Sequence, residues 1–408
     1  MIVLAVMIIG GGVYARSQVR ASLPKLDGTS SIAGLSADVR VERDALGVPT
    51  INADTREDVA RALGFLHAQD RFFQMDLQRR QPAGELAALV GARALDVDEE
   101  IRVHRFRNVA KRALELTSPA YRALLQAYAD GVNAGLNALA APPFEYLVLR
   151  ATPEPWTPED SMLTVLAMFN TLQGRQATFE RSHGALRDTL PEPMFQFLST
   201  VGSEWETPVV GTPVARPPIP GPEIFSVRSG RATETRKHGD VFGKDKNLTS
   251  LFSGSVPSWP GRQPVGEEAS TIGSNNWAVD GAHSVSGAAI LANDMHLSIA
   301  VPIIWYRASF AFSGERITGV TLPGIPSMVV GSNGHVAWGF TNTGGDWSDL
   351  VLIEPDPRDP AKYLTPDGPK PFETFQETIA AKGGDARTSI VRTTIWGPVV
   401  WKDARGRE

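Results

Sequence analysis

The sequence predicts an α+β fold in which a mostly helical first half is followed by a strand-rich second half. Apolar residues recur at helical spacing through the first 200 residues or so, whereas alternation of β-branched and aromatic residues begins after Ser274. A stretch rich in proline, glycine and serine separates the halves. We therefore expect a signal peptide or membrane anchor (residues 1–15), a helical region (16–206), a linker (207–273) and a strand-rich region (274–408).

Composition excludes several classes of protein. Of the 408 residues, 42% are hydrophobic and 21% are charged, which is typical of a globular chain with a proper core. The formal net charge of −5 does not indicate nucleic-acid binding, which typically requires an excess of basic residues. No cysteine is present, so a catalytic thiol, a thiolate metal site and disulfides are excluded.

Residues 1–15 are almost wholly apolar and end at Arg16. This length suits the apolar region of a signal peptide better than a membrane span of about 20 residues. The glycines at 10–12 would weaken a helix, and the alternative is a buried first helix. We expect export, with a periplasmic location or retention at the inner membrane by an uncleaved anchor.

The first half contains clear helix and turn signals. Residues 39–53 read as two short extended pieces around a turn. Thr55 is a suitable N-cap for a helix that Pro82 and Gly84 would end or bend. Further helices are expected after Ser118 and from Pro158.

The linker and the second half have different patterns. Prolines and a charged run fill residues 207–272, a composition that buries too little apolar surface to offset its ordering entropy. We expect a mobile linker that is open to proteolysis. Beyond it, the expected strands, each bounded by turn signals, cover residues 277–279, 288–292, 304–312, 317–322, 328–330 and 336–340.

Ser274 follows the linker directly, at the start of the strand-rich half. A serine exposed by cleavage would carry a hydroxyl nucleophile and a free α-amino group on one residue. That amine has an ordinary pKa of about 7.7–8.0, so it could serve as the general base. Cleavage before Ser274 would therefore create an acyl-transfer centre.

Several separated motifs occur in one order along the chain. They are residues 43–49 (RDALGVP), 66–71 (LHAQDR), 274–277 (SNNW), 291–297 (LANDMHL), 331–334 (GSNG) and 338–342 (WGFTN). With these motifs the chain resembles the penicillin acylase family of N-terminal-nucleophile hydrolases, from about Val39 onward. The resemblance implies a four-layer αββα fold and a precursor cut into an α chain, a spacer peptide and a β chain. It also implies hydrolysis of a small-molecule acyl amide.

The resemblance also implies roles for site residues. Ser274 would be the nucleophile, and the backbone N–H of Asn342 would donate to the developing oxyanion, a contact typically worth about 3–4 kcal/mol. His296 would hydrogen-bond the hydroxyl or amine of Ser274; the alternative for His296 is a turn cap after Asp294. His67 is expected to pack and hydrogen-bond within the first long helix. The family's second oxyanion donor, an asparagine side chain, has no counterpart in this sequence.

Calcium is the expected cofactor, bound as one structural ion. Asp346 and Asp349 lie three residues apart and, with the Ser348 carbonyl, offer the hard oxygen ligands that calcium prefers. In the family, calcium at this place ties the β chain to a glutamate of the α chain, for which Glu180 is our choice. The alternative is a solvated acidic turn.

The acyl pocket is expected to be apolar. By resemblance its lining would include Leu297, Val330 and Phe340, together with Met168, Phe169 and Leu172 of the helical half. All of these residues would also suit an ordinary core. The enzymatic alternative is an acyl-homoserine-lactone or other long-chain acylase, which His296 favours, and a further alternative is an unprocessed envelope binding or scaffold protein.

Relatives continue well beyond the equivalent of Glu408 and commonly have histidine in place of Trp396. We therefore expect the chain to be incomplete and to have little amidase activity by itself. Acyl specificity and oligomeric state are not evident from the sequence.

Overall fold

The structure is a computed structural model that describes residues 2–174, 176–199, 210–212, 215–225, 273–297, 299–342, 347–403 and 405–408. Most of the expected linker therefore lies outside the described residues. The chain divides into two compact units. The first comprises Met1–Leu172, Ser250–Gly344 and Glu373–Val399, and the second comprises Gln173–Thr249, Gly345–Phe372 and Val400–Glu408.

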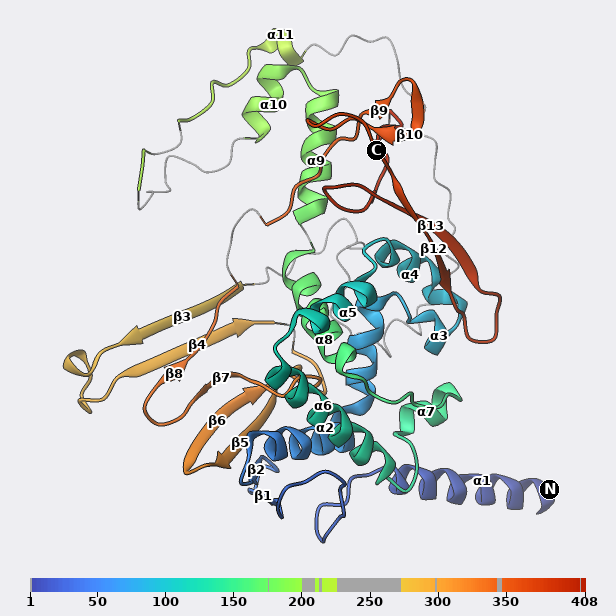
Figure 1. The fold of residues 1–408 in the computed structure, drawn as a ribbon, viewed down its shortest axis with the longest axis vertical. Coiled ribbons are helices and arrows are strands. Elements are labelled where there is room, and N and C mark those ends of the chain that lie inside the picture. Colours follow the sequence, from blue (N-terminus) through green and yellow to red (C-terminus); the bar gives the residue numbers. More distant parts are fainter. Residues whose placement is uncertain are drawn as a thin grey trace. The chain divides into compact units, whose positions relative to one another are not determined.

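The first unit combines helices with sheets, as the α+β prediction requires (Figure 1). Its helices are α1 (Ile2–Ala21), α2 (Arg56–Ala83), α3 (Ala87–Val90), α4 (Leu95–Arg102), α5 (Phe106–Leu116), α6 (Pro119–Asn137), α7 (Phe144–Leu149) and α8 (Pro158–Gln173). Its strands are β1 (Arg40–Arg43), β2 (Pro49–Asn52), β3 (Gly273–Val279), β4 (Ile290–His296), β5 (Tyr306–Phe312), β6 (Glu315–Thr321), β7 (Met328–Ser332), β8 (Ala337–Trp338), β12 (Glu373–Ile379) and β13 (Arg387–Thr393).

The local signals in the sequence act as expected. The Thr55 hydroxyl accepts a hydrogen bond from the Asp58 N–H at the start of α2, and Gly84 ends α2 with a left-handed φ of 64°. The Ser118 hydroxyl caps α6 in the same way through the Tyr121 N–H. Pro82 lies within the last turn of α2 and does not end it earlier.

Helix α1 differs from expectation, because it continues through the glycines at 10–12 and beyond Arg16. Its apolar side chains Leu4, Met7, Ile9 and Val13 are exposed. The assignment of this segment as a signal peptide, an anchor or a buried helix stays a prediction. Among the helices that the structure describes, none has both the length and the apolar character needed to cross a membrane.

A six-stranded sheet joins the two halves of the sequence. Its order is β1-β2-β5-β6-β7-β8, in which β2 and β5 are parallel, with Ile51 opposite Phe310, and the other neighbours are antiparallel. Strands β1 and β2 precede the linker, whereas β5 to β8 follow it. One sheet therefore contains strands from both sides of the expected cleavage site.

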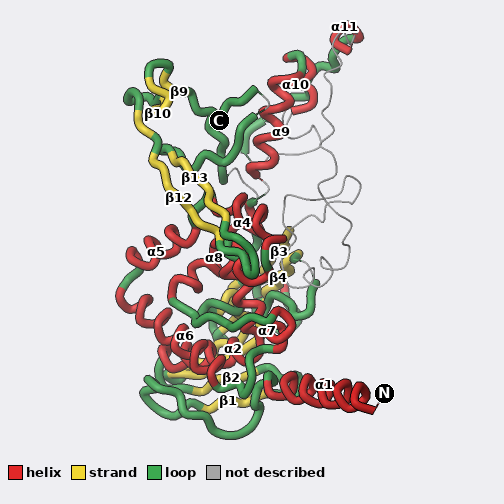
Figure 2. Tube along the Cα trace, turned by 90° about the vertical axis from the view of Figure 1, so that its right-hand side faces the viewer, coloured by secondary structure: helices red, strands yellow, loops and turns green. Residues whose placement is uncertain are grey.

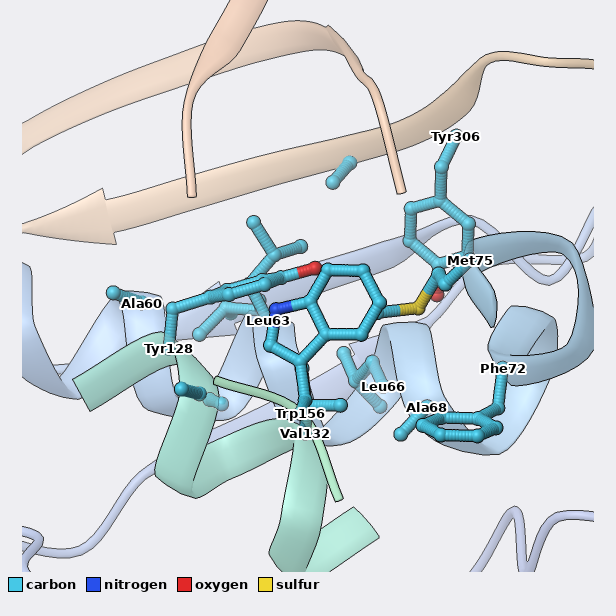
Figure 3. Packing of buried hydrophobic residues seen from close by; sticks show 14 of the residues in the cluster. Ala60, Leu63, Leu66, Ala68, Phe72, Met75, Tyr128, Val132, Trp156 and Tyr306 are labelled. Atoms are coloured by element: carbon cyan, nitrogen blue, oxygen red, sulfur yellow. The ribbon is translucent and has the colours of Figure 1, made fainter. Parts of the chain in front are cut away.

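Helices α2 and α6 pack closely on one another and contribute to the main core. A Cβ at Gly64 would lie 2.3 Å from the Tyr128 carbonyl oxygen, so only glycine allows this approach. The core includes Leu63, Met75, Trp156 and Tyr306, with Tyr128 of α6 among them (Figure 3). Apolar residues of both halves share this core, which also contains Phe310 of β5.

His67 has the packing role that the sequence predicts. It is fully buried, its Nδ1 lies 2.8 Å from the Tyr128 hydroxyl, and its Nε2 lies 3.0 Å from the Thr321 hydroxyl. Burial lowers the pKa of His67 to about 3, so the imidazole stays neutral at physiological pH. One side chain thus connects α2, α6 and β6.

The second unit is smaller and contains α9 (Gln176–Thr189), α10 (Glu192–Ser199), α11 (Pro222–Phe225), β9 (Pro355–Asp356), β10 (Asp359–Tyr363) and β11 (Lys370–Pro371) (Figure 2). Strands β11, β10 and β9 form a small antiparallel sheet in that order. Tyr363 is buried there beside the Phe372 ring, with 4.9 Å between ring centroids. Arg407 forms an ion pair with Asp188 of α9.

Candidate active site

Ser274 is the second residue of β3, which forms a hairpin with β4 (Figure 1). Ser274 lies opposite Met295, and Gly273 lies opposite His296. Successive side chains of a strand point to opposite faces of its sheet. Ser274 and Met295 therefore share one face of the hairpin, and Asn275, Asp294 and His296 share the other.

The Asn342 N–H is directed at Ser274. Its nitrogen lies 3.5 Å from the Ser274 Oγ, at the limit of a hydrogen bond, although the two residues are 68 positions apart. A backbone donor at this distance from a hydroxyl nucleophile lies close to the place where an oxyanion would form when that hydroxyl attacks a carbonyl. The structure thus brings together the predicted nucleophile and the predicted backbone donor.

His296 makes its contacts on the opposite face of the hairpin. Its Nε2 lies 3.0 Å from the Asp294 Oδ2 and 3.3 Å from the Asn275 Nδ2. One ring nitrogen cannot donate to the carboxylate and accept from the amide at once, so the shorter contact, to Asp294, is taken as the hydrogen bond of the His296 ring among the described residues. The register does not direct the ring toward the Ser274 hydroxyl. The positioning role of His296 stays a prediction.

Asn293 has a place in the site that sequence reasoning missed. Its side-chain Nδ2 donates to the carbonyl oxygens of Phe340 and Asn275, at 2.9 and 3.2 Å, and its Oδ1 accepts from the Phe340 N–H at 3.3 Å. Asparagine is uncommon inside strands. Asn293 lies one residue beyond the strand expected at 288–292, and its place within the motif at 291–297 was the signal that could have drawn attention to it.

The residues expected to line the acyl pocket present apolar surface. Phe169 and Phe340 are exposed by 48% and 59%, and Met168, Leu172, Leu297 and Val330 are half-buried. These side chains could contact an apolar acyl group. Their grouping into one pocket stays a prediction.

The metal-site residues are only partly described. Asp346 lies outside the described residues, whereas Glu180, Ser348 and Asp349 lie inside them. Among the residues that have been placed, no group of three or more acidic, histidine or cysteine side chains is arranged to hold a metal ion. The calcium site stays a prediction.

A pocket of about 410 Å³ in the first unit contains none of the predicted site residues. It is lined by Arg79, Arg80, Arg102 and Arg107, with Glu85, Glu154 and Asp160 between them. Each of these carboxylates pairs with an arginine, and buried Asp160 pairs with two. Because the charges are paired, the pocket is a structural ion-pair cluster and we assign it no chemistry.

Comparison with known proteins gives consistent matches. The family model described as penicillin amidase matches residues 38–407. A penicillin acylase 2 proenzyme from Pseudomonas sp. strain SE83 is 33% identical over 395 residues, which cover 95% of this chain and 47% of that protein. The acyl-homoserine lactone acylase QuiP of Pseudomonas aeruginosa is 31% identical over 391 residues, which cover 93% of this chain and 42% of QuiP.

The matched region thus spans less than half the length of these two curated relatives. Among solved structures, a thermostable penicillin G acylase from Alcaligenes faecalis aligns over 43% of this chain and 98% of the matched chain, with 26% sequence identity and a TM-score of 0.35.

Proposed function

The chain belongs to the penicillin amidase family, and on that basis we propose that it carries the nucleophile of an amide hydrolase. Ser274 would remove the acyl group from an amide after becoming the N-terminus of a β chain. The observation that carries the proposal is the 3.5 Å distance between the Ser274 Oγ and the backbone nitrogen of Asn342. The four-layer αββα arrangement of the complete protein is part of the same proposal.

Self-cleavage would come first. The Ser274 hydroxyl adds to the carbonyl carbon of Gly273, and the peptide C–N bond between them breaks as the acyl group moves from nitrogen to oxygen. Water then hydrolyses the resulting ester, which leaves a carboxylate on Gly273 and a free amine on Ser274. The relative named a proenzyme supports synthesis as a precursor that is later processed.

Amide hydrolysis would use the new amine as the general base. It accepts the hydroxyl proton, through a water molecule, while the Ser274 Oγ attacks the substrate carbonyl. The Asn342 N–H donates to the oxyanion, the proton passes to the departing amine, and an ester on Ser274 forms. Water hydrolyses that ester and releases the carboxylic acid. His296 would help to orient the Ser274 hydroxyl or amine.

Two substrate classes follow from the relatives. The relative named penicillin acylase favours an acyl amide of the penicillin type, and the relative named acyl-homoserine lactone acylase favours an acyl-homoserine lactone. For the second class we propose a longer, aliphatic acyl chain. In both cases the acyl group is apolar, which suits exposed Phe169 and Phe340.

Calcium and export complete the proposal. Asp346, Ser348 and Asp349 would supply oxygen ligands to one structural calcium ion, with Glu180 as the ligand from the α chain. The apolar start of the chain would direct the protein to the periplasm or anchor it at the inner membrane.

The test uses the protein at its full natural length. Wild-type protein should show two chains by intact-mass analysis, and Ser274→Ala should remain one chain. Wild type should hydrolyse a phenylacetyl nitroanilide or a dodecanoyl nitroanilide, and the preferred one separates the two substrate classes. Cleavage of the Ser274→Ala variant at the same bond would defeat self-processing. An uncleaved wild type without hydrolysis would favour the scaffold alternative.

A further inference from the structure

We infer that Asn293 is a positioning residue that holds the Asn342 N–H opposite Ser274. This inference rests on the proposed amide hydrolase function and adds a residue to its machinery. Asn293 lies on β4, whereas the donor lies beyond β8.

The backbone does not explain the placement by itself. The ladder between β7 and β8 ends at Trp338, which pairs with Gly331, and residues 339–342 belong to no described strand. Asn293 reaches across to Phe340, donating to its carbonyl oxygen at 2.9 Å and accepting from its N–H at 3.3 Å. These are the two contacts that a neighbouring strand would make with Phe340.

The same side chain also contacts the nucleophile's strand. The Nδ2 of Asn293 donates to the carbonyl oxygen of Asn275, the residue directly after Ser274, at 3.2 Å. One amide group therefore joins the residue next to the nucleophile to a residue two positions before the donor. The segments that contain Asn275 and Phe340 are therefore both held by the side-chain amide of Asn293.

Gly339 makes room for this contact. A Cβ at position 339 would lie 2.9 Å from the Cβ and the Oδ1 of Asn293, closer than real Cβ contacts. A larger residue at 339 would push the amide away from Phe340. Asn293 and Gly339 therefore form a pair, and changes at the two positions should not be additive.

The consequence for catalysis follows from geometry. Oxyanion donors act at 2.7–3.1 Å from the oxyanion, and a displacement of about 1 Å can cost about a hundredfold in rate. Without the amide contacts, the segment at 339–342 loses its link to β4. The Asn342 N–H then moves away from Ser274, whereas the residues that would bind the substrate stay in place.

The experiment compares Asn293→Ala, Gly339→Ala and the double variant in the full-length protein. Hydrolysis of the better nitroanilide is measured per mole of cleaved chain. Each single variant should lower kcat about tenfold to a hundredfold with KM within about twofold. The double variant should be no slower than the worse single one. Asn52→Ala is the control, because Asn52 makes one long contact, 3.4 Å to the Arg40 carbonyl oxygen, on β2.

Hydrogen exchange gives a second readout that needs no activity. In Asn293→Ala, amides of residues 339–342 should exchange faster, and those of β5 and β6 should not change. If the alanine variant does not fold, Asn293→Asp replaces it. This variant keeps the shape of the side chain but places an oxygen against the Phe340 carbonyl oxygen, so it should also make residues 339–342 exchange faster.

Unchanged exchange at 339–342, or a kcat within threefold of wild type, would overturn the inference. Loss of protection that extends to β5 and β6 would also overturn it, because the effect would then be global. If wild type hydrolyses neither anilide, the proposed function fails, and the exchange of residues 339–342 still decides whether Asn293 holds that segment.

Discussion

Asp98 is a fully buried carboxylate that organises the turn before α3. Its oxygens accept hydrogen bonds from the backbone N–H groups of Leu86 and Ala87, at 3.0 and 2.6 Å. Burial raises the pKa of Asp98 to about 6, from the 3.8 of an unperturbed aspartate. Its two hydrogen bonds do not fully offset the cost of burying the charge.

This pKa predicts how stability depends on pH. Between pH 4 and 6 the folded protein binds a proton at Asp98 that the unfolded chain does not, so this residue stabilises the fold at low pH and the contribution is lost as pH rises through 6. Relative to Asp98→Asn, the wild-type free energy of unfolding should fall by about 2 kcal/mol between pH 4 and pH 7. Denaturant titration across that range measures it, and a constant difference between the two proteins would contradict it.

Single residues were predictable from the sequence where the reason was local or where the motif was specific. The packing role of His67, the cap at Thr55 and the helix start after Ser118 are confirmed. The role of Asn293 was not predictable, because its partner Phe340 lies 47 residues further along the chain.

Among the secondary-structure elements, the hairpin of β12 and β13 shows where the sequence pattern is misleading. Residues of β12 on one face include Phe375, Glu377 and Ile379, so a charge interrupts the apolar positions. Glu377 is compensated by Arg105, whose Nε lies 2.8 Å away although it is 272 positions distant. Without knowledge of that partner, the alternation of inward and outward residues along β12 could not be recognised from the sequence. By contrast, β5 to β8 were expected from their own residues and turns, and they are confirmed.

Ile379 should be the residue that docks this hairpin on the helical half. Its side chain is fully buried with Ala87 and Leu95, whereas Ile390 on β13 is 61% exposed. Ile379→Ala should lower the free energy of unfolding by about 2–5 kcal/mol, and the matched variant Ile390→Ala by less than about 0.5 kcal/mol. Denaturant unfolding of both variants tests this, and equal losses would show that the hairpin is not held through Ile379.

At the scale of the whole molecule, the halves on either side of the linker contribute strands to one sheet and side chains to one core. Strand β2 pairs with β5 across the linker, and Ile51, Leu63 and Phe310 lie in one core. Arg387 of β13 adds ion pairs to Asp96 and Glu99 of α4, at 2.7 and 2.8 Å. Cleavage before Ser274 would leave all of these contacts intact. The α+β class was predictable from patterns, but this sharing of one sheet is a long-range arrangement that periodicity does not encode.

Calcium removal should therefore weaken the processed protein without separating its chains. An ion bound only by the folded state adds RT ln(1 + [L]/Kd), about 2.7 kcal/mol at a hundredfold excess over Kd. A chelator should lower the melting temperature of the full-length, cleaved protein, and calcium should restore it, while size-exclusion chromatography in chelator still shows both chains in one peak. The matched control is Asp349→Asn, which should melt lower than wild type and respond less to chelator. An unchanged melting temperature would remove calcium from the proposal. Separation of the chains would instead contradict the argument that the shared sheet and core hold the two halves together.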